Sequence, residues 1–105
     1  MLYCSTFTTY DKQIIRDYRW EGEDADYGDK LFQAVVNSPR VKCDYRVKTT
    51  RKNYKDDSEV TLNYELSCLI DGYQMILHID CLARTAWACI EHNAVDLDVF
   101  LLSNA

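Results

Sequence analysis

The segment Val60–Ala83, VTLNYELSCLIDGYQMILHIDCLA, carries the strongest structural signal in the sequence. Asp71-Gly72 lies at its centre, and this dipeptide favours a type I′ turn because both central positions need positive φ. A two-residue turn fixes the register of an antiparallel hairpin, since a slip by one residue would move every side chain to the other face. The predicted register places apolar or thiol side chains opposite one another in these pairs: Ile70 and Tyr73, Cys68 and Met75, Leu66 and Leu77, Tyr64 and Ile79, Leu62 and Cys81, and Val60 and Ala83.

A third strand is predicted before this hairpin. The segment VKCDYRVK, residues 41–48, alternates apolar and charged side chains with the period of two that is typical of a half-buried strand. The alternation predicts an inward face made of Val41, Cys43, Tyr45 and Val47.

Two helices are predicted toward the N-terminus. The segment TTYDKQIIRDYRW, residues 8–20, places Tyr10, Ile14 and Tyr18 at helical spacing. The segment GDKLFQAVVNSPR, residues 28–40, groups apolar residues at helical spacing and ends near Pro39, as helices do.

The C-terminal third is ambiguous. Residues 85–93, TAWACIEHN, fit a strand or a helix, and residues 94–102, AVDLDVFLL, alternate as a strand would. We expect an α+β fold in which two N-terminal helices pack on one face of an antiparallel meander of about four strands. A chain of 105 residues fits a single globular domain, residues 1–105. The second face of the sheet is then mixed, and its apolar members Leu69, Ile76 and Leu82 would be covered by the C-terminal segment or by a second copy in a homodimer.

Composition excludes several classes of protein. No run is long and apolar enough for a membrane span, and the first residues do not resemble a signal peptide. The five cysteines are an odd number without a C-x-x-C pair, which argues against a zinc site or a disulfide scaffold. We expect free thiols in a reducing cytoplasm, with no metal and no cofactor.

The catalytic candidates are few. In the predicted register His78 faces Glu65 across the hairpin, and Asp80 lies two residues further on the same face. Cys68 and Cys81 point to the opposite face, so no nucleophile lies beside the histidine. Cys89 and His92 are three residues apart, and no phosphate loop or hydrolase motif is present. We therefore expect a non-enzymatic protein and keep a small enzyme with a His78/Glu65/Asp80 site as an alternative.

Charge is strongly segregated along the chain. Residues 40–55 hold seven basic and one acidic side chain, although the whole chain has a net charge of -5. This basic hairpin suggests a nucleic-acid-binding protein as a second alternative, but the acidic overall balance argues against direct nucleic-acid binding. The basic side chains could also be neutralised by Glu65 and Asp80 across the sheet. The residues that would contact phosphates are Lys42, Arg46, Lys48, Arg51, Lys52 and Lys55.

The segment WEGEDADYGD, residues 20–29, has five carboxylates and no basic residue. Such a stretch is typical of a surface that docks on a basic partner, although it would also fit a solvated loop that favours the following helix through its dipole. We expect a small acidic inhibitor or protein-binding protein, by analogy with phage-encoded anti-defence (anti-CRISPR-like) inhibitors and immunity proteins, acting on nucleic-acid-processing machinery. The expected partner-binding residues are Trp20, Glu21, Glu23, Asp24, Asp26, Tyr27 and Asp29.

Overall fold

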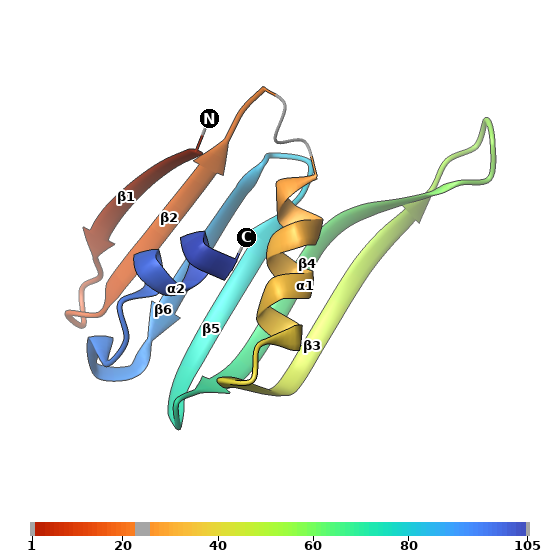
Figure 1. Ribbon diagram of the computed structural model, residues 1–105. Helices are drawn as coiled ribbons and strands as arrows, with labels where there is room; N and C mark the ends of the chain where they lie inside the picture. The colour runs from red at the N-terminus through yellow and green to blue at the C-terminus, as the bar shows by residue number, and fades with distance from the viewer. Residues whose placement is uncertain (1, 23–25, 105) are drawn as a thin grey trace.

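The computed structural model describes residues 2–22 and 26–104 as an antiparallel sheet with helices on one face (Figure 1). The sheet has six strands in the order β1-β2-β6-β5-β4-β3. Helices α1 and α2 lie side by side across the same face of this sheet in Figure 1. The elements are β1 (Leu2–Thr8), β2 (Ile14–Trp20), α1 (Tyr27–Asn37), β3 (Val41–Lys52), β4 (Glu59–Ile70), β5 (Tyr73–Asp80), β6 (Thr85–Ile90), the short 3₁₀-helix η1 (Glu91–Asn93) and α2 (Leu97–Asn104).

The predicted fold class is wrong in two respects, because the helices are not both N-terminal and the sheet has six strands rather than four. Residues 8–20, predicted as a helix, contain β2 and the turn that joins it to β1. Lys12 adopts a φ of 66° in that turn and donates its amide hydrogen to the carbonyl of Thr9. Because β2 is paired with β1 on one side and β6 on the other, sheet pairing overrides the weak helical spacing.

The second predicted helix is confirmed as α1. Leu31 and Val35 are fully buried against the sheet, and the helix ends two residues before Pro39. Gly28 lets the helix approach closely, since a Cβ atom there would lie 3.1 Å from the sulfur of Cys81 and 3.1 Å from a methyl group of Ile79.

The C-terminal ambiguity is resolved into a strand followed by a helix. Residues 85–90 form β6, whereas the alternating segment predicted as a strand, residues 94–102, contains most of α2. The carboxylate of Asp96 accepts hydrogen bonds from the amides of Asp98 and Val99 and so caps the helix. Leu97, Phe100 and Leu101 are buried, because their spacing places them on one side of a helix.

The β4–β5 hairpin is confirmed, with a φ of 50° at Asp71 and 86° at Gly72. The predicted pairs are observed from Ile70 and Tyr73 to Tyr64 and Ile79. The strand pairing ends at Asn63 and Asp80, although the amide of Cys81 still donates to the carbonyl of Leu62 at 3.0 Å, as the predicted register requires. The chain then turns away toward β6, so Val60 and Ala83 are not paired. Residues 59–61 pair with β3, and the end of the β3–β4 hairpin, residues 49–62, projects beyond the rest of the sheet as an arm (Figure 1).

A bulge in β3 changes the predicted face of the residues that follow it. Cys43 lies opposite Cys68, but the next pair is Tyr45 and Ser67, so Asp44 is an extra residue. Val41 and Cys43 pack at the edge of the core as predicted. Tyr45 and Val47 are not inward, because the extra residue turns them to the face that the helices do not cover.

Candidate functional site

The helices leave one face of the sheet uncovered, and we call it the open face. Its central side chains come from five strands, because alternate residues of each strand point away from the core. Three of its large side chains are exposed: Tyr45 by 54%, Ile76 by 45% and Trp87 by 37%. The central residues of the open face are Ile15, Asp17, Tyr45, Glu65, Ser67, Ile76, His78, Asp80, Trp87 and Cys89.

A hollow of about 290 Å³ lies at the centre of the open face. Tyr45 on β3 and Trp87 on β6 line its two sides, with β4 and β5 between them. Ser67 and Ile76 lie opposite each other on these inner strands and line the floor. The small side chain of Ser67 leaves room between the aromatic rings, and its hydroxyl is held by the side-chain amide of Gln74 at 2.6 Å.

A row of four side chains crosses the open face beside this hollow. Register places Asp17, Trp87, His78 and Glu65 on neighbouring strands, which are spaced about 4.8 Å apart. The rings of Trp87 and His78 stack with centroids 5.8 Å apart, and Nδ1 of His78 lies 3.6 Å from Oε1 of Glu65. In this row the stacked rings of Trp87 and His78 therefore lie between the carboxylates of Asp17 and Glu65.

The charge around this row is mainly negative. Asp17, Glu65 and Asp80 contribute carboxylates to the open face. Arg19 lies over the ring of Tyr3 and 3.7 Å from Glu21. Lys42 is also on this face, because it lies opposite Leu69 on the edge strand β3. An incoming cation would thus find carboxylates that no lysine or arginine of the described residues contacts.

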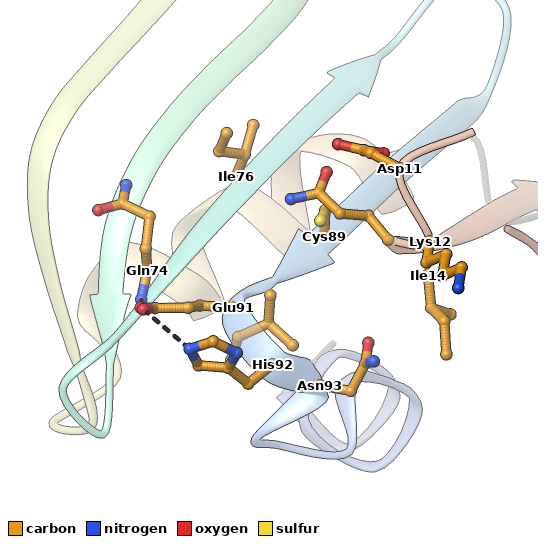
Figure 2. A pocket seen from close by; sticks show the side chains of 11 residues that line it. Asp11, Lys12, Ile14, Gln74, Ile76, Cys89, Glu91, His92 and Asn93 are labelled. Carbon is orange, nitrogen blue, oxygen red and sulfur yellow. Dashed lines mark hydrogen bonds and ion pairs between the residues drawn. The ribbon is translucent and has the colours of Figure 1, made fainter. Parts of the chain in front are cut away.

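A second, larger hollow of about 600 Å³ continues from the open face toward the β1–β2 turn (Figure 2). Ile76 lines both hollows, so the two form one surface across the sheet. In Figure 2 the remaining side chains of this second hollow come from the β1–β2 turn, the starts of β2 and β5, the end of β6, and η1. The combined surface is longer than one side chain and suits an extended segment of a partner.

The Cys89 and His92 pair lines the second hollow without forming a catalytic dyad. Burial raises the pKa of the Cys89 thiol, which disfavours the nucleophilic thiolate. The imidazole Nε2 of His92 lies 3.5 Å from the carboxylate of Glu91, and Figure 2 shows this contact as a dashed line. The geometry gives no support to nucleophilic catalysis at this pair.

The predicted His78/Glu65/Asp80 set is brought to one face, but its members do not converge. His78 contacts Glu65, whereas Oδ1 of Asp80 accepts hydrogen bonds from the amides of Leu82 and Ala83 and holds the turn to β6. Across residues 2–22 and 26–104, no cluster of three or more histidine, cysteine or carboxylate side chains could hold a metal ion.

The predicted acidic docking residues do not form one exposed surface. Trp20 is 1% exposed and packs in the core against Tyr27, with ring centroids 5.0 Å apart, so it cannot contact a partner. The carboxylate of Asp29 accepts a hydrogen bond from the hydroxyl of Tyr64. Glu21, Asp26 and Asp29 are exposed, and Glu21 lies at the rim of the open face after β2. Glu23 and Asp24 lie outside the described residues.

The predicted basic residues lie along the arm and the edge strand β3. The expected neutralisation is not observed, since none of them forms an ion pair with any residue that the structure describes. Glu65 contacts His78 instead. Tyr54, at the tip, is fully exposed. The exposed basic residues are Lys42, Arg46, Lys48, Arg51, Lys52 and Lys55.

Comparison of the chain with protein-family models, with curated proteins and with solved structures found no match. No helix in residues 2–22 and 26–104 is long and apolar enough to cross a membrane.

The two aromatic walls of the central hollow were not predicted from the sequence. Tyr45 was predicted to face inward, because a bulge leaves no mark in a simple alternation. The sequence around Trp87 did carry a signal, because Trp87 lies between the small residues Ala86 and Ala88. In a strand, this alternation indicates that Trp87 lies on one face and the two alanines lie on the other.

Proposed function

We propose that this chain is a non-enzymatic protein-binding protein that docks on a basic segment of a partner through its open face. The observation that carries the proposal is the hollow between Tyr45 and Trp87, with Glu65 on its wall. A lysine or arginine has an apolar stem and a cationic head, which suit aromatic walls and a carboxylate respectively. A compact inhibitor of nucleic-acid-processing machinery, such as a phage-encoded anti-defence protein, is the setting that we propose, because such machinery presents basic surfaces.

Arginine fits the row beside the hollow better than lysine. Its planar guanidinium can stack on the indole of Trp87 and form paired hydrogen bonds with the carboxylate of Asp17 or Glu65. Tryptophan and arginine are also the residues that most often dominate the energy of protein interfaces. The exposed Ile76, between the two hollows, would contact an apolar side chain of the same segment.

A displayed library of random peptides, selected against the parent protein, tests this proposal. Enriched peptides should carry arginine or lysine next to apolar residues. Their affinity should fall by about tenfold or more for Trp87→Ala, which corresponds to about 1.4 kcal/mol. Glu65→Gln should weaken binding mainly at low salt, where charge attraction is least screened. Enrichment without basic residues, or affinity unchanged by both substitutions, would contradict the proposal.

Matched variants locate the surface. The double variant Glu21→Ser/Asp26→Ser removes two exposed carboxylates of the acidic stretch and keeps Asp29, which accepts a hydrogen bond from Tyr64. Arg51→Ser/Lys52→Ser removes cations of the arm. On our proposal Arg51→Ser/Lys52→Ser binds the peptides like the parent, and Glu21→Ser/Asp26→Ser loses only a small part of the affinity. A large loss of affinity in Glu21→Ser/Asp26→Ser, together with unchanged affinity in Trp87→Ala, would place docking on the acidic stretch instead.

The arm carries a second candidate function, which is binding of single-stranded nucleic acid. The favouring observation is that its cations contact no carboxylate of the described residues, while Tyr54 offers an exposed ring for stacking. A labelled oligonucleotide would distinguish the two functions. Binding that falls steeply with salt and is lost in Arg51→Ser/Lys52→Ser would favour the arm.

A further inference from the structure

Cys43 and Cys68 form a pair of thiols whose geometry is close to that of a disulfide. They lie directly opposite each other on β3 and β4, and their sulfur atoms are 2.8 Å apart. Opposed residues of antiparallel strands have Cα atoms about 4.5–5.5 Å apart, which is within the range that a disulfide spans. Both cysteines are free in the structure.

We propose that Cys43 and Cys68 are a site of reversible covalent modification, which forms an intramolecular disulfide when the protein meets a low-molecular-weight disulfide such as oxidised glutathione. The proposal does not depend on what the open face binds.

The order of the steps follows from exposure. Cys43 is half-buried on the edge strand β3, whereas Cys68 is fully buried. The Cys43 thiolate therefore attacks a sulfur of oxidised glutathione, the sulfur–sulfur bond breaks, and one glutathione leaves as a thiolate that takes up a proton. Cys68 then loses its proton to solvent and attacks the Cys43 sulfur, which releases the second glutathione. Two protein thiols are oxidised, and one glutathione disulfide is reduced to two thiols.

The burial of Cys68 explains why it acts second. Burial and the contact with Cys43 raise the pKa of the Cys68 thiol, so it is a poor first nucleophile. Once Cys43 carries the mixed disulfide, the short distance between the two sulfurs gives the second step a high effective concentration.

The other three cysteines lack such a partner. Cys4 donates its thiol hydrogen to Asp98, Cys81 lies under α1 beside Gly28, and Cys89 lies on the open face. In the part of the chain that the structure describes, Cys43 and Cys68 are the one pair of thiols in direct contact. The oxidation should therefore be selective for this pair.

The experiment equilibrates the folded protein with glutathione buffers of increasing oxidised fraction, followed by acid quenching, thiol titration in denaturant and intact mass measurement. We expect two of the five thiols to disappear with the loss of two hydrogen atoms. A non-reducing peptide map should join the peptides that contain Cys43 and Cys68. Added dithiothreitol should restore all five thiols.

Variants make the result decisive. Cys43→Ala and Cys68→Ala should each lose the intramolecular product, and Cys81→Ala should keep it, with folding of each checked by circular dichroism. Five titratable thiols in every buffer, a mixed glutathione adduct on Cys43 that never resolves, or a disulfide to another cysteine would overturn the proposal.

Discussion

At the scale of single residues, small irregularities decide where functional side chains lie. Asp44 is one extra residue in β3, yet it places Tyr45 on the open face and moves Arg46 and Lys48 to the side of the helices. Gly28 is a second such position, because it lets the start of α1 approach Cys81 on the sheet. The effect of Asp44 comes from its position as an inserted residue, and the effect of Gly28 comes from its lack of a side chain. The composition of the chain therefore reveals neither effect.

Gly28→Ala should destabilise the protein by about 1–3 kcal/mol, because the added methyl group forces atoms apart in a packed site. Its Cβ would lie 3.1 Å from both Cys81 and Ile79. The measurement is the free energy of unfolding in urea, with Gln33→Ala on the exposed side of α1 as the control. Stability equal to that of the control variant would show that α1 does not pack as closely as described.

At the scale of elements, the hairpin around Asp71 and Gly72 and the helix α1 were predictable, since local turn chemistry and helical spacing agree there with the final packing. The strand β3 was predictable as well, because residues 41–48 alternate apolar and charged side chains, and it pairs with β4 as expected. The remaining elements, β1, β2, β6 and α2, were not. β2 became a strand because it pairs on both sides, and α2 became a helix because Asp96 caps it and Asp98 ties it to Tyr18. Such long-range contacts compete with local periodicity and cannot be read from it.

The same limit applies to the candidate site. The pairing of His78 and Glu65 followed from the hairpin register and is confirmed. The neighbourhood of Trp87 required the order of β6 and β5, and that of Tyr45 required a bulge. The docking role of the acidic stretch stays a prediction, although Trp20 is removed from it by burial.

The protein should be less stable at alkaline pH, because the tyrosine that anchors α2 ionises there. The hydroxyl of Tyr18 donates to Asp98 at 2.8 Å, and burial followed by this carboxylate raises the pKa of Tyr18 well above its usual range. Burial and Asp29 similarly raise the pKa of Tyr64 to about 12. Because the pKa values of both tyrosines are raised in the folded state, their contribution to stability is complete below the ordinary tyrosine pKa of 10.0 and is lost as pH rises above it.

Urea unfolding at about pH 8 and about pH 10.5 measures this effect. The parent should lose stability at the higher pH, and Tyr18→Phe should lose less because it has no phenol to ionise at that position. An equal decline in both proteins would show that Tyr18 is not the group responsible.

At the scale of the whole molecule, the two faces of the sheet have different roles. One face is sealed by α1 and α2 and holds the core, including Leu77 and Phe100. The other exposes aromatic, apolar and acidic side chains without a covering element, and the basic arm extends to one side (Figure 1). The carboxylates of the open face, which is the face that we propose for docking, are thus separated from the cations at the end of the arm within a chain whose net charge is -5.

The central claim is that the open face is the surface that takes a basic partner. The most direct measurement is a two-dimensional amide NMR titration of the isotope-labelled protein with an extended arginine-valine peptide of about ten residues, the length of a long strand. We predict the largest shift changes at the indole NH of Trp87 and at the amides of Tyr45 and Ile76, with little change at Arg51 and Lys52. Changes confined to α1, α2 or the arm, with Trp87 unmoved at saturating peptide, would contradict the account.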